Sequence, residues 1–316
     1  MMKRRAFVTL LSGAVAWPFT ARAQQAPADR KLDPRITPAR GDIAAKHLAG
    51  VVEAQRFVEG KAYEIGAAQA PVRDKPAPDA ELQTEALKGE RLTVYDIDAQ
   101  GWAWGQLAAD GYVGYLPASA LVAPGPAATH KVTALRTFVL PGPSIRLPPL
   151  EMLSFGSRLV IARIEEPFAI TASGGHVPTV HVAAVEKTET DFVALAERFL
   201  GTPYLWGGKT SIGLDCSALV QLALNACGMP CPRDTDMQEK ALGSALADPS
   251  RPDNWRRGDL VFWKGHVAIV RDAATLVHAS GNYSTVIVEP TGPAIARILA
   301  EEAHEVRTVR RLPPPA

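Results

Sequence analysis

One cysteine and two histidines carry the residue types needed for nucleophilic catalysis. Cys216 follows Asp215 and opens a segment whose apolar residues recur at the spacing of one helical face, namely Leu219, Leu222, Ala223 and Ala226. A cysteine at a helix start lies near the positive end of the helix dipole and near unpaired N–H groups. Both lower the pKa of a thiol and favour the nucleophilic thiolate. Taken alone, the same pattern also fits a buried structural cysteine, because free cysteines are among the most buried residues.

The two histidines lie on predicted strands downstream of this helix. Residues 257–263 and 266–270 predict two strands joined by a short turn, which places His266 at the head of the second. His278 lies near the end of a third predicted strand, residues 275–279. A cysteine, a histidine and a further polar residue on the next strand supply a nucleophile, a base and a group that orients the base.

Five motifs, in this order, carry a resemblance to a known family: PYLWGG, LDCSALVQ, RGDLVFW, GHVAIV and LVHASG. Over residues 188–311 the chain resembles the NlpC/P60 cysteine peptidases. The resemblance implies an α+β fold with a papain-like core, with Cys216 as nucleophile, His266 as base and His278 as the third member. Ala218 departs from the pattern, since many members carry glycine there, but it bears no catalytic group.

The resemblance also implies a substrate, the amide between γ-D-glutamate and a diamino acid in murein (peptidoglycan) stem peptides, and no cofactor. We expect the Cys216 thiolate to attack the carbonyl, with His266 first as its ion-pair partner and then as proton donor to the leaving amine. The backbone N–H of Cys216 is the expected oxyanion donor. Tyr204 either adds its hydroxyl there or is a core residue.

In members that combine SH3 domains with this peptidase domain, the resemblance implies a pocket for the free amine of an N-terminal L-alanine. The matching positions are Asp215 and Ser217, with Thr235 as a further contact. From the barrel we expect an acidic residue and a tyrosine, chosen from Glu81, Glu85, Tyr112 and Tyr115. An ammonium gains charge-assisted hydrogen bonds from carboxylates, which an N-acylated peptide cannot. The alternative is that Asp215 only caps its helix and the glutamates are solvated.

The region before the peptidase domain is predicted to contain one or two small β-barrels. Residues 62–123 read as short strands, and GWAWGQL followed by DGYVGYLPASAL resembles bacterial SH3 domains. Residues 130–186 echo this pattern and predict a second SH3-like barrel. Residues 24–61 predict a linker, with one helix over residues 42–57. Residues 188–200 predict the first helix of the peptidase domain, capped by a threonine.

The first 23 residues predict a secretory signal peptide. A basic start, an apolar stretch and an Ala21-Arg22-Ala23 cleavage pattern follow one another. We therefore expect an exported, periplasmic protein, without a membrane span once the signal is removed. The Arg4-Arg5 pair also resembles a twin-arginine signal, and the export route stays open.

Export makes the three cysteines informative, because disulfides form outside the cytoplasm. Cys227 and Cys231 are close enough in sequence for a local bridge, which would leave Cys216 unpaired. Zinc is the rival explanation for three cysteines near histidines. We expect no metal, because the sequence has no C-x-x-C pair.

Composition excludes several classes of function and leaves three open. A net charge of +1 over 316 residues gives no general attraction to nucleic acid. The chain is then a murein peptidase, a Cys-His amidase or acyltransferase acting on another substrate, or a wall-binding protein with an inactive enzyme domain. A nucleophile and base fix a reaction type but not a substrate. The oligomeric state cannot be predicted from these patterns.

Overall fold

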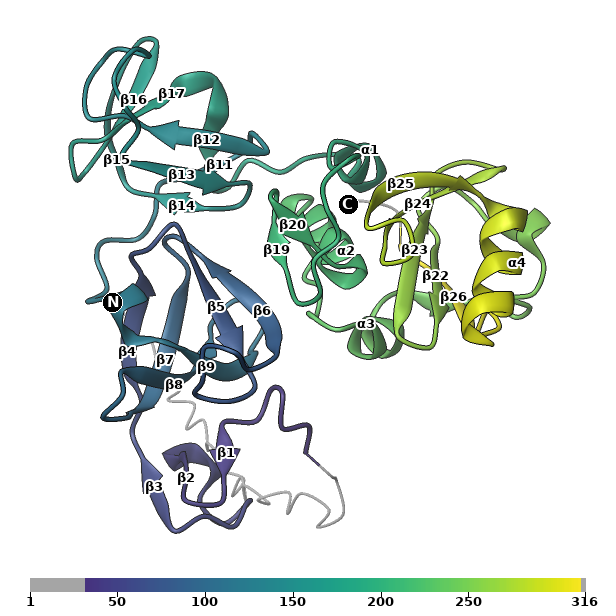
Figure 1. The fold of residues 1–316 in the computed structure, drawn as a ribbon, viewed down its shortest axis with the longest axis horizontal. Coiled ribbons are helices and arrows are strands. Elements are labelled where there is room, and N and C mark those ends of the chain that lie inside the picture. The colour runs from purple at the N-terminus through teal and green to yellow at the C-terminus, as the bar shows by residue number, and fades with distance from the viewer. Residues whose placement is uncertain (1–31, 314–316) are drawn as a thin grey trace, which may run out of the picture. The chain divides into compact units, whose positions relative to one another are not determined.

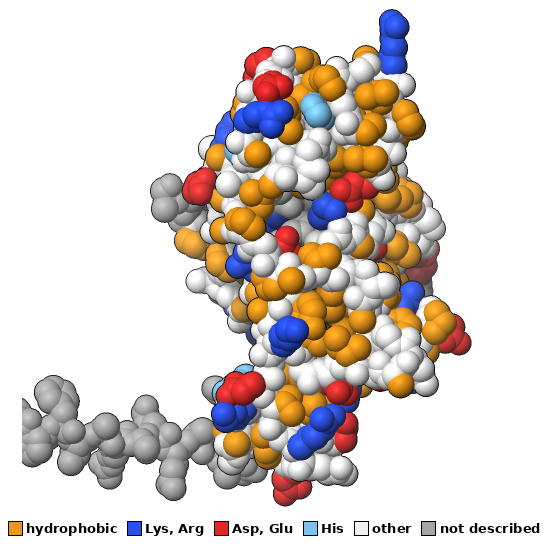
Figure 2. All heavy atoms as spheres, turned by 90° about the vertical axis from the view of Figure 1, so that its left-hand side faces the viewer, with side chains coloured by type: hydrophobic (Ala, Val, Ile, Leu, Met, Phe, Trp, Pro, Cys, Tyr) orange, Lys and Arg blue, Asp and Glu red, His pale blue; other side chains and the backbone are white. Residues whose placement is uncertain are grey.

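The computed structural model describes residues 32–313. The predicted signal peptide lies outside the described residues. Within them, no helix is both long enough and apolar enough to cross a membrane. Figure 2 shows one face of the molecule, on which basic and acidic side chains are interspersed among hydrophobic ones, in keeping with the small net charge.

The segment before the first barrel is a small sheet, so the helix predicted over residues 42–57 is wrong. The sheet has the order β1-β2-β3, with a 3-10 turn (Lys46–Leu48) after the second strand. Its strands are β1 (Ala39–Arg40), β2 (Ile43–Ala45) and β3 (Arg56–Val58). The three residues of β2 are all buried in succession, as in a strand covered on both faces, whereas a surface helix buries one stripe.

The first barrel is a seven-stranded sheet with the order β10-β4-β7-β8-β9-β5-β6. Its strands are β4 (Lys61–Ile65), β5 (Gln69–Arg73), β6 (Leu82–Leu87), β7 (Arg91–Ile97), β8 (Trp102–Leu107), β9 (Val113–Pro117) and β10 (Leu121–Val122). Buried and less buried residues alternate in β9, so Leu116 points into the core while Tyr115 points away.

Residues 130–184 form three small antiparallel sheets around a separate apolar cluster that includes Leu153 and Val177. The strands are β11 (His130–Val132), β12 (Arg136–Val139), β13 (Glu151–Ser154), β14 (Arg158–Leu159), β15 (Ile161–Glu165), β16 (Phe168–Thr171), β17 (His176–Pro178) and β18 (Val182–Ala184). This region ends in a strand, a 3-10 turn and a strand, as the first barrel does.

The C-terminal region is a six-stranded antiparallel sheet with helices on both faces (Figure 1). The sheet order is β21-β26-β22-β23-β24-β25. Its strands are β21 (Ser244–Ala245), β22 (Leu260–Trp263), β23 (His266–Val270), β24 (Thr275–Ser280), β25 (Thr285–Pro290) and β26 (Thr308–Arg311). A two-stranded ribbon, β19 (Lys209–Thr210) and β20 (Gly213–Leu214), precedes the second helix.

Alternation along the strands decides which helix covers which face. The helices are α1 (Phe192–Glu197), α2 (Cys216–Ala226), α3 (Thr235–Ala241) and α4 (Thr291–Glu302). Phe262 packs with the residues of α1 and α2, whereas its neighbours Val261 and Trp263 pack with α4. Helix α1 is shorter than predicted, and Asp191 rather than a threonine caps it, accepting hydrogen bonds from the N–H groups of Val193 and Ala194.

Candidate active site

Cys216 is the first residue of α2, and the N-cap predicted for that helix is confirmed. Asp215 has extended backbone angles, and its Oδ1 accepts a hydrogen bond from the Ala218 N–H at 2.8 Å. The same oxygen accepts the Ser217 hydroxyl at 2.9 Å. Nearly every residue of α2 is buried, so the helix is fixed in the core and holds the cysteine rigidly.

The Cys216 sulfur contacts the chain on both sides of His266. It lies 3.9 Å from the Gly265 carbonyl oxygen and accepts a hydrogen bond from the Val267 N–H, with the Thr235 hydroxyl also at 3.9 Å. Burial raises the pKa of the thiol to about 11, and the negative charge of Asp215 adds to this rise. The contacts from Val267 and Thr235 oppose it without reversing it. The geometry therefore favours a thiol rather than the thiolate expected from the helix start.

His266 and His278 are hydrogen-bonded to each other. His266 Nε2 lies 2.8 Å from His278 Nδ1, and the side chain of His278 is almost fully buried. Burial, followed by the charge of His278, lowers the pKa of His266 to about 3. The raised thiol pKa and the lowered imidazole pKa both favour a neutral Cys216 and a neutral His266 at rest over the ion pair expected from the sequence.

His278 has a further partner that the sequence analysis missed. Its Nε2 lies 3.1 Å from Oε2 of Glu289, which is buried at the end of β25. Arg297 of α4 donates to both carboxylate oxygens of Glu289, at 3.0 and 2.8 Å. A glutamate at the end of an apolar strand gives no signal by itself, because its link to His278 depends on the register between two strands.

A pocket of about 260 Å³ opens above the cysteine. The predicted residues Tyr204, Asp215, Ser217 and Thr235 all line it together with Cys216. Burial raises the pKa of Tyr204 well above its usual range, so the hydroxyl stays protonated and able to donate. The structure thus brings together the residues that the NlpC/P60 resemblance placed around the nucleophile.

The barrel residues proposed for this pocket need correction. Tyr115 accepts a hydrogen bond from Arg40 at 3.1 Å and lies outside the pocket, because it points away from the barrel core. Glu85 is buried and accepts the Lys209 N–H at 2.8 Å, so it joins the barrel to the ribbon β19–β20. Glu81 accepts the indole N–H of Trp206, which lines the pocket, but does not line it itself.

Other residues take their places. Gln83 and Tyr112 of the first barrel line the pocket, as do Asp234, Asp236 and, from the segment before β1, Arg35. The Tyr112 hydroxyl donates to Asp234 at 3.1 Å. Arg35 pairs with Asp234 at 2.8 Å and Asp236 at 2.7 Å. Of these residues only Tyr112 was a sequence candidate, because the others depend on how distant segments meet.

Asp215 does not present a free carboxylate to the pocket. Arg233, which is 1% exposed, donates to both of its oxygens at 2.9 and 2.7 Å. The same guanidinium donates to the Ser217 hydroxyl at 2.8 Å. Asp215 is therefore a helix cap neutralised by a buried arginine, and the expectation that it binds the substrate amine through its charge is not supported.

All three cysteines are free thiols, so the local bridge between Cys227 and Cys231 that the sequence left open is not formed. Among residues 32–313, no group of three His, Cys, Asp or Glu side chains is arranged to hold a metal ion.

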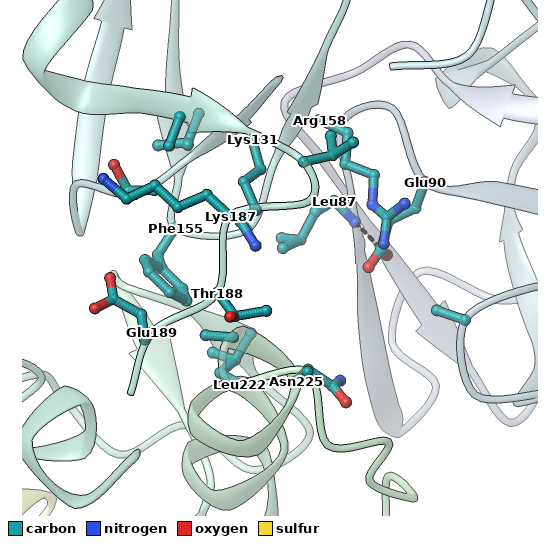
Figure 3. A pocket seen from close by; sticks show the side chains of 18 of the residues that line it. Leu87, Glu90, Lys131, Phe155, Arg158, Lys187, Thr188, Glu189, Leu222 and Asn225 are labelled. Carbon is teal, nitrogen blue, oxygen red and sulfur yellow. Dashed lines mark hydrogen bonds between the residues drawn. The ribbon is translucent and has the colours of Figure 1, made fainter. Parts of the chain in front are cut away.

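A larger cavity of about 710 Å³ lies away from the cysteine, and Figure 3 shows its walls. Lys131, Arg158 and Lys187 reach into it from one side, and Leu222 and Asn225 of α2 form another part of its lining. Cys216 lines the smaller pocket and not this cavity, so the chemistry belongs to the smaller pocket.

Family models match two parts of the chain. The NlpC/P60 family model matches residues 201–298, and the model of the bacterial dipeptidyl-peptidase SH3 domain matches residues 72–121. The chain therefore contains an NlpC/P60 domain preceded by an SH3 domain of the dipeptidyl-peptidase type. Both motif-based recognitions made from the sequence are confirmed.

Curated relatives match part of the chain. Dipeptidyl-peptidase 6 of Lysinibacillus sphaericus is 38% identical over 88 residues, which are 28% of this chain and 31% of that protein. The gamma-D-glutamyl-L-lysine dipeptidyl-peptidase of Bacillus subtilis is 34% identical over 109 residues, 32% of this chain and 35% of that one. The matches thus span about a third of each relative's length.

Among solved structures, an NlpC/P60 family protein from Bacillus cereus ATCC 10987 is similar over most of the chain. It aligns with a TM-score of 0.67 at 20% identity, covering 80% of this chain and 100% of that one. At this identity the similarity establishes a common fold.

Proposed function

We propose that this chain is a cysteine peptidase that hydrolyses the γ-D-glutamyl–diamino acid amide of murein stem peptides. One observation carries the proposal. The Cys216 sulfur contacts Gly265 and Val267, the residues on either side of His266, and His266 is hydrogen-bonded to His278. The names of the relatives, dipeptidyl-peptidase 6 and gamma-D-glutamyl-L-lysine dipeptidyl-peptidase, support the substrate class.

The reaction begins from neutral partners. Because His266 is unprotonated above a pH of about 3, it takes the thiol proton as the sulfur bonds to the scissile carbonyl carbon. The Cys216 N–H and the Tyr204 hydroxyl stabilise the oxyanion. The C–N bond then breaks as His266 returns its proton to the leaving amine, which leaves a thioester. Water, deprotonated by His266, hydrolyses the thioester and restores the thiol.

The pocket also supports recognition of a free amino terminus. Its lining holds four carboxylates, those of Asp215, Asp234, Asp236 and Glu239, and two guanidinium groups, those of Arg35 and Arg307. Arg233 neutralises Asp215, so three carboxylates against two cations leave one negative charge in excess. We assign the amine of an N-terminal L-alanine to Asp234, because Arg35 and Tyr112 both donate to its Oδ2 and neither donates to its Oδ1, whereas Arg233 occupies both oxygens of Asp215. An N-acylated stem peptide brings no compensating charge and more bulk.

The decisive experiment incubates the protein with L-Ala-γ-D-Glu-diaminopimelate and identifies the products by mass. Cleavage between the glutamate and the diamino acid would support the proposal. We expect Cys216→Ala to abolish this cleavage. Cys227→Ala is the matched control, because Cys227 is also a free thiol but does not line the pocket. No cleavage at this bond, with turnover of another amide or of an ester supplied in parallel, would favour the amidase or acyltransferase alternative. Binding to murein without any product would favour an inactive wall-binding protein.

Comparing the free and N-acetylated peptides tests the amine pocket separately. We expect kcat/KM to fall by at least about tenfold on acetylation, which corresponds to one lost charge-assisted contact. Equal values for the two peptides would remove the amine pocket while leaving the peptidase assignment intact.

Three further assignments belong to this proposal. Residues 130–186 are a second SH3-like barrel, supported by the strand, 3-10 turn and strand with which both regions end. The peptidase domain has a papain-like core, supported by the cysteine helix packed on an antiparallel sheet. The protein is exported to the periplasm, supported by the pattern of residues 1–23. An intact amino terminus on protein recovered from the producing cells would contradict export by signal cleavage.

A further inference from the structure

The inference concerns Glu289 and rests on the proposed function for the identity of the reaction it serves. We propose that Glu289 is a positioning residue of the active site, which fixes through His278 the nitrogen of His266 that accepts the thiol proton, while Arg297 balances the charge of Glu289.

The sheet register places Glu289 beside His278. In the antiparallel pair β24–β25, His278 lies opposite Ile287 and Leu276 lies opposite Glu289. Residues two apart on one strand share a face, so Glu289 is the diagonal neighbour of His278. The resulting Nε2 to Oε2 distance is 3.1 Å, and both side chains are buried. Two buried polar groups this close need each other as partners.

The carboxylate of Glu289 determines the proton positions along the hydrogen-bonded series Glu289, His278 and His266, because an ionised carboxylate can only accept hydrogen bonds. His278 must therefore carry its proton on Nε2, and in the neutral ring its Nδ1 must then accept. His266 Nε2, which lies 2.8 Å away, must donate to it. A neutral imidazole carries one ring proton, and in His266 this proton lies on Nε2. Nδ1 of His266 is therefore unprotonated and can act as the base. These proton positions are assigned from the hydrogen-bond network.

Arg297 keeps Glu289 ionised without leaving a net charge beside the histidines. Burial raises the pKa of Glu289, but the hydrogen bonds from His278 and Arg297 outweigh it and hold the pKa at about 2. The two contacts from Arg297 form a bidentate pair. The Tyr283 hydroxyl donates at 3.3 Å to Oε1 of Glu289, the oxygen that does not contact His278. At neutral pH the carboxylate and the guanidinium cancel, so the pair places no net charge beside the histidines.

The competing explanation is that Glu289 only ties α4 to the sheet. Two substitutions distinguish the two roles, because they remove opposite charges from the same ion pair. The negative charge of Glu289 raises the pKa of His266, and the positive charge of Arg297 lowers it. Arg297→Gln should therefore move the acidic limb of the kcat/KM profile to higher pH, and Glu289→Gln should not. A purely structural tie would leave kcat per folded molecule unchanged in both variants.

The first measurement is steady-state kinetics on the full chain. Glu289→Gln is expected to lower kcat by about 10- to 100-fold, the range seen for outer partners of a functional histidine, with KM within about twofold. Glu301→Gln is the matched control, because Glu301 also accepts from Arg297, at 3.5 Å, but is exposed and does not touch His278. Loss of activity only in proportion to loss of folded protein would overturn the inference.

The second measurement needs no substrate, so it separates this inference from the proposed function. Proton–nitrogen correlation spectra of the histidine rings report which nitrogen carries hydrogen. In the wild type we expect both His266 and His278 to be protonated on Nε2, and in Glu289→Gln a mixture of tautomers. Unchanged tautomers in the folded variant, or a wild-type His266 protonated on Nδ1, would overturn the positioning role even if the peptidase is active.

Discussion

Arg233 links the first barrel to the cysteine helix through a single buried guanidinium. Its Nε donates to the Thr84 hydroxyl of β6 at 2.8 Å, and its terminal nitrogens donate to both oxygens of Asp215. Gly207 approaches the same strand so closely that an added Cβ would lie 2.3 Å from the Leu82 carbonyl oxygen, and its φ of +71° also favours glycine. The barrel is therefore part of the support of the active site.

We predict that Arg233→Met destabilises the protein by about 3–5 kcal/mol, because it leaves Asp215 buried without a counter-charge. The free energy of unfolding from urea titration measures this. Arg163→Ala is the control, since Arg163 and its partner Glu165 are both exposed, and its effect should stay within about 1 kcal/mol. Equal effects of the two substitutions would mean that the buried pair contributes no more than a surface pair.

The second prediction concerns the resting state of Cys216. Because burial raises the pKa of its thiol to about 11, the rate of alkylation by iodoacetamide should still be rising at pH 10. Mass spectrometry of the peptide that contains Cys216 gives this rate, and Cys227, which is half-buried, provides an internal reference. A rate that is already constant below pH 7 would instead show the thiolate–imidazolium pair expected from the sequence.

The third prediction separates two tyrosines that lie three residues apart. Tyr112→Phe removes the hydroxyl that donates to Asp234 in the pocket, so KM for the peptide with a free amino terminus should rise several-fold. Asp234→Asn should raise it further, by more than about tenfold, because it removes the charge. For the N-acetylated peptide, both substitutions should change KM less than they do for the free peptide.

Tyr115→Phe is the control for this series. Tyr115 is hydrogen-bonded to Arg40 outside the pocket, so the Tyr115→Phe variant should cleave both peptides as the wild type does. If Tyr115→Phe altered selectivity and Tyr112→Phe did not, the original sequence assignment of Tyr115 would be restored.

What could be predicted from the sequence were features set by local pattern. The helix that begins at Cys216, its cap Asp215 and the strand that begins at His266 each depend on residues within one short segment. The apolar spacing, the capping residue and the turn were all visible there. For the same reason the two domains recognised from their motifs were identified correctly.

Features set by long-range pairing could not be predicted. Gln83, Asp234 and Arg35 meet only because three distant segments pack together, and nothing in each segment marks it as part of a pocket. The charge of Asp215 was visible, but the buried Arg233 that neutralises it was not. The rise in the thiol pKa could not be predicted for a related reason, since the helix start is a local feature and burial is a property of the whole fold.

The last prediction concerns acid stability and follows from the depressed pKa of Glu289. A carboxyl group whose pKa is lower in the folded protein than in the unfolded chain stabilises the fold above its unfolded value and loses that contribution as pH falls through its folded value. For Glu289 these are about 4.5 and about 2. The difference in unfolding free energy between wild type and Glu289→Gln should therefore be constant above pH 5 and shrink toward pH 2. Urea titrations at five pH values across this range would measure it, with Glu165→Gln at an exposed site as the control. A difference that grew as the pH fell would mean that burial, rather than the hydrogen bonds from His278 and Arg297, dominates this carboxyl group, and the ionised Glu289 on which the histidine tautomers depend would be excluded.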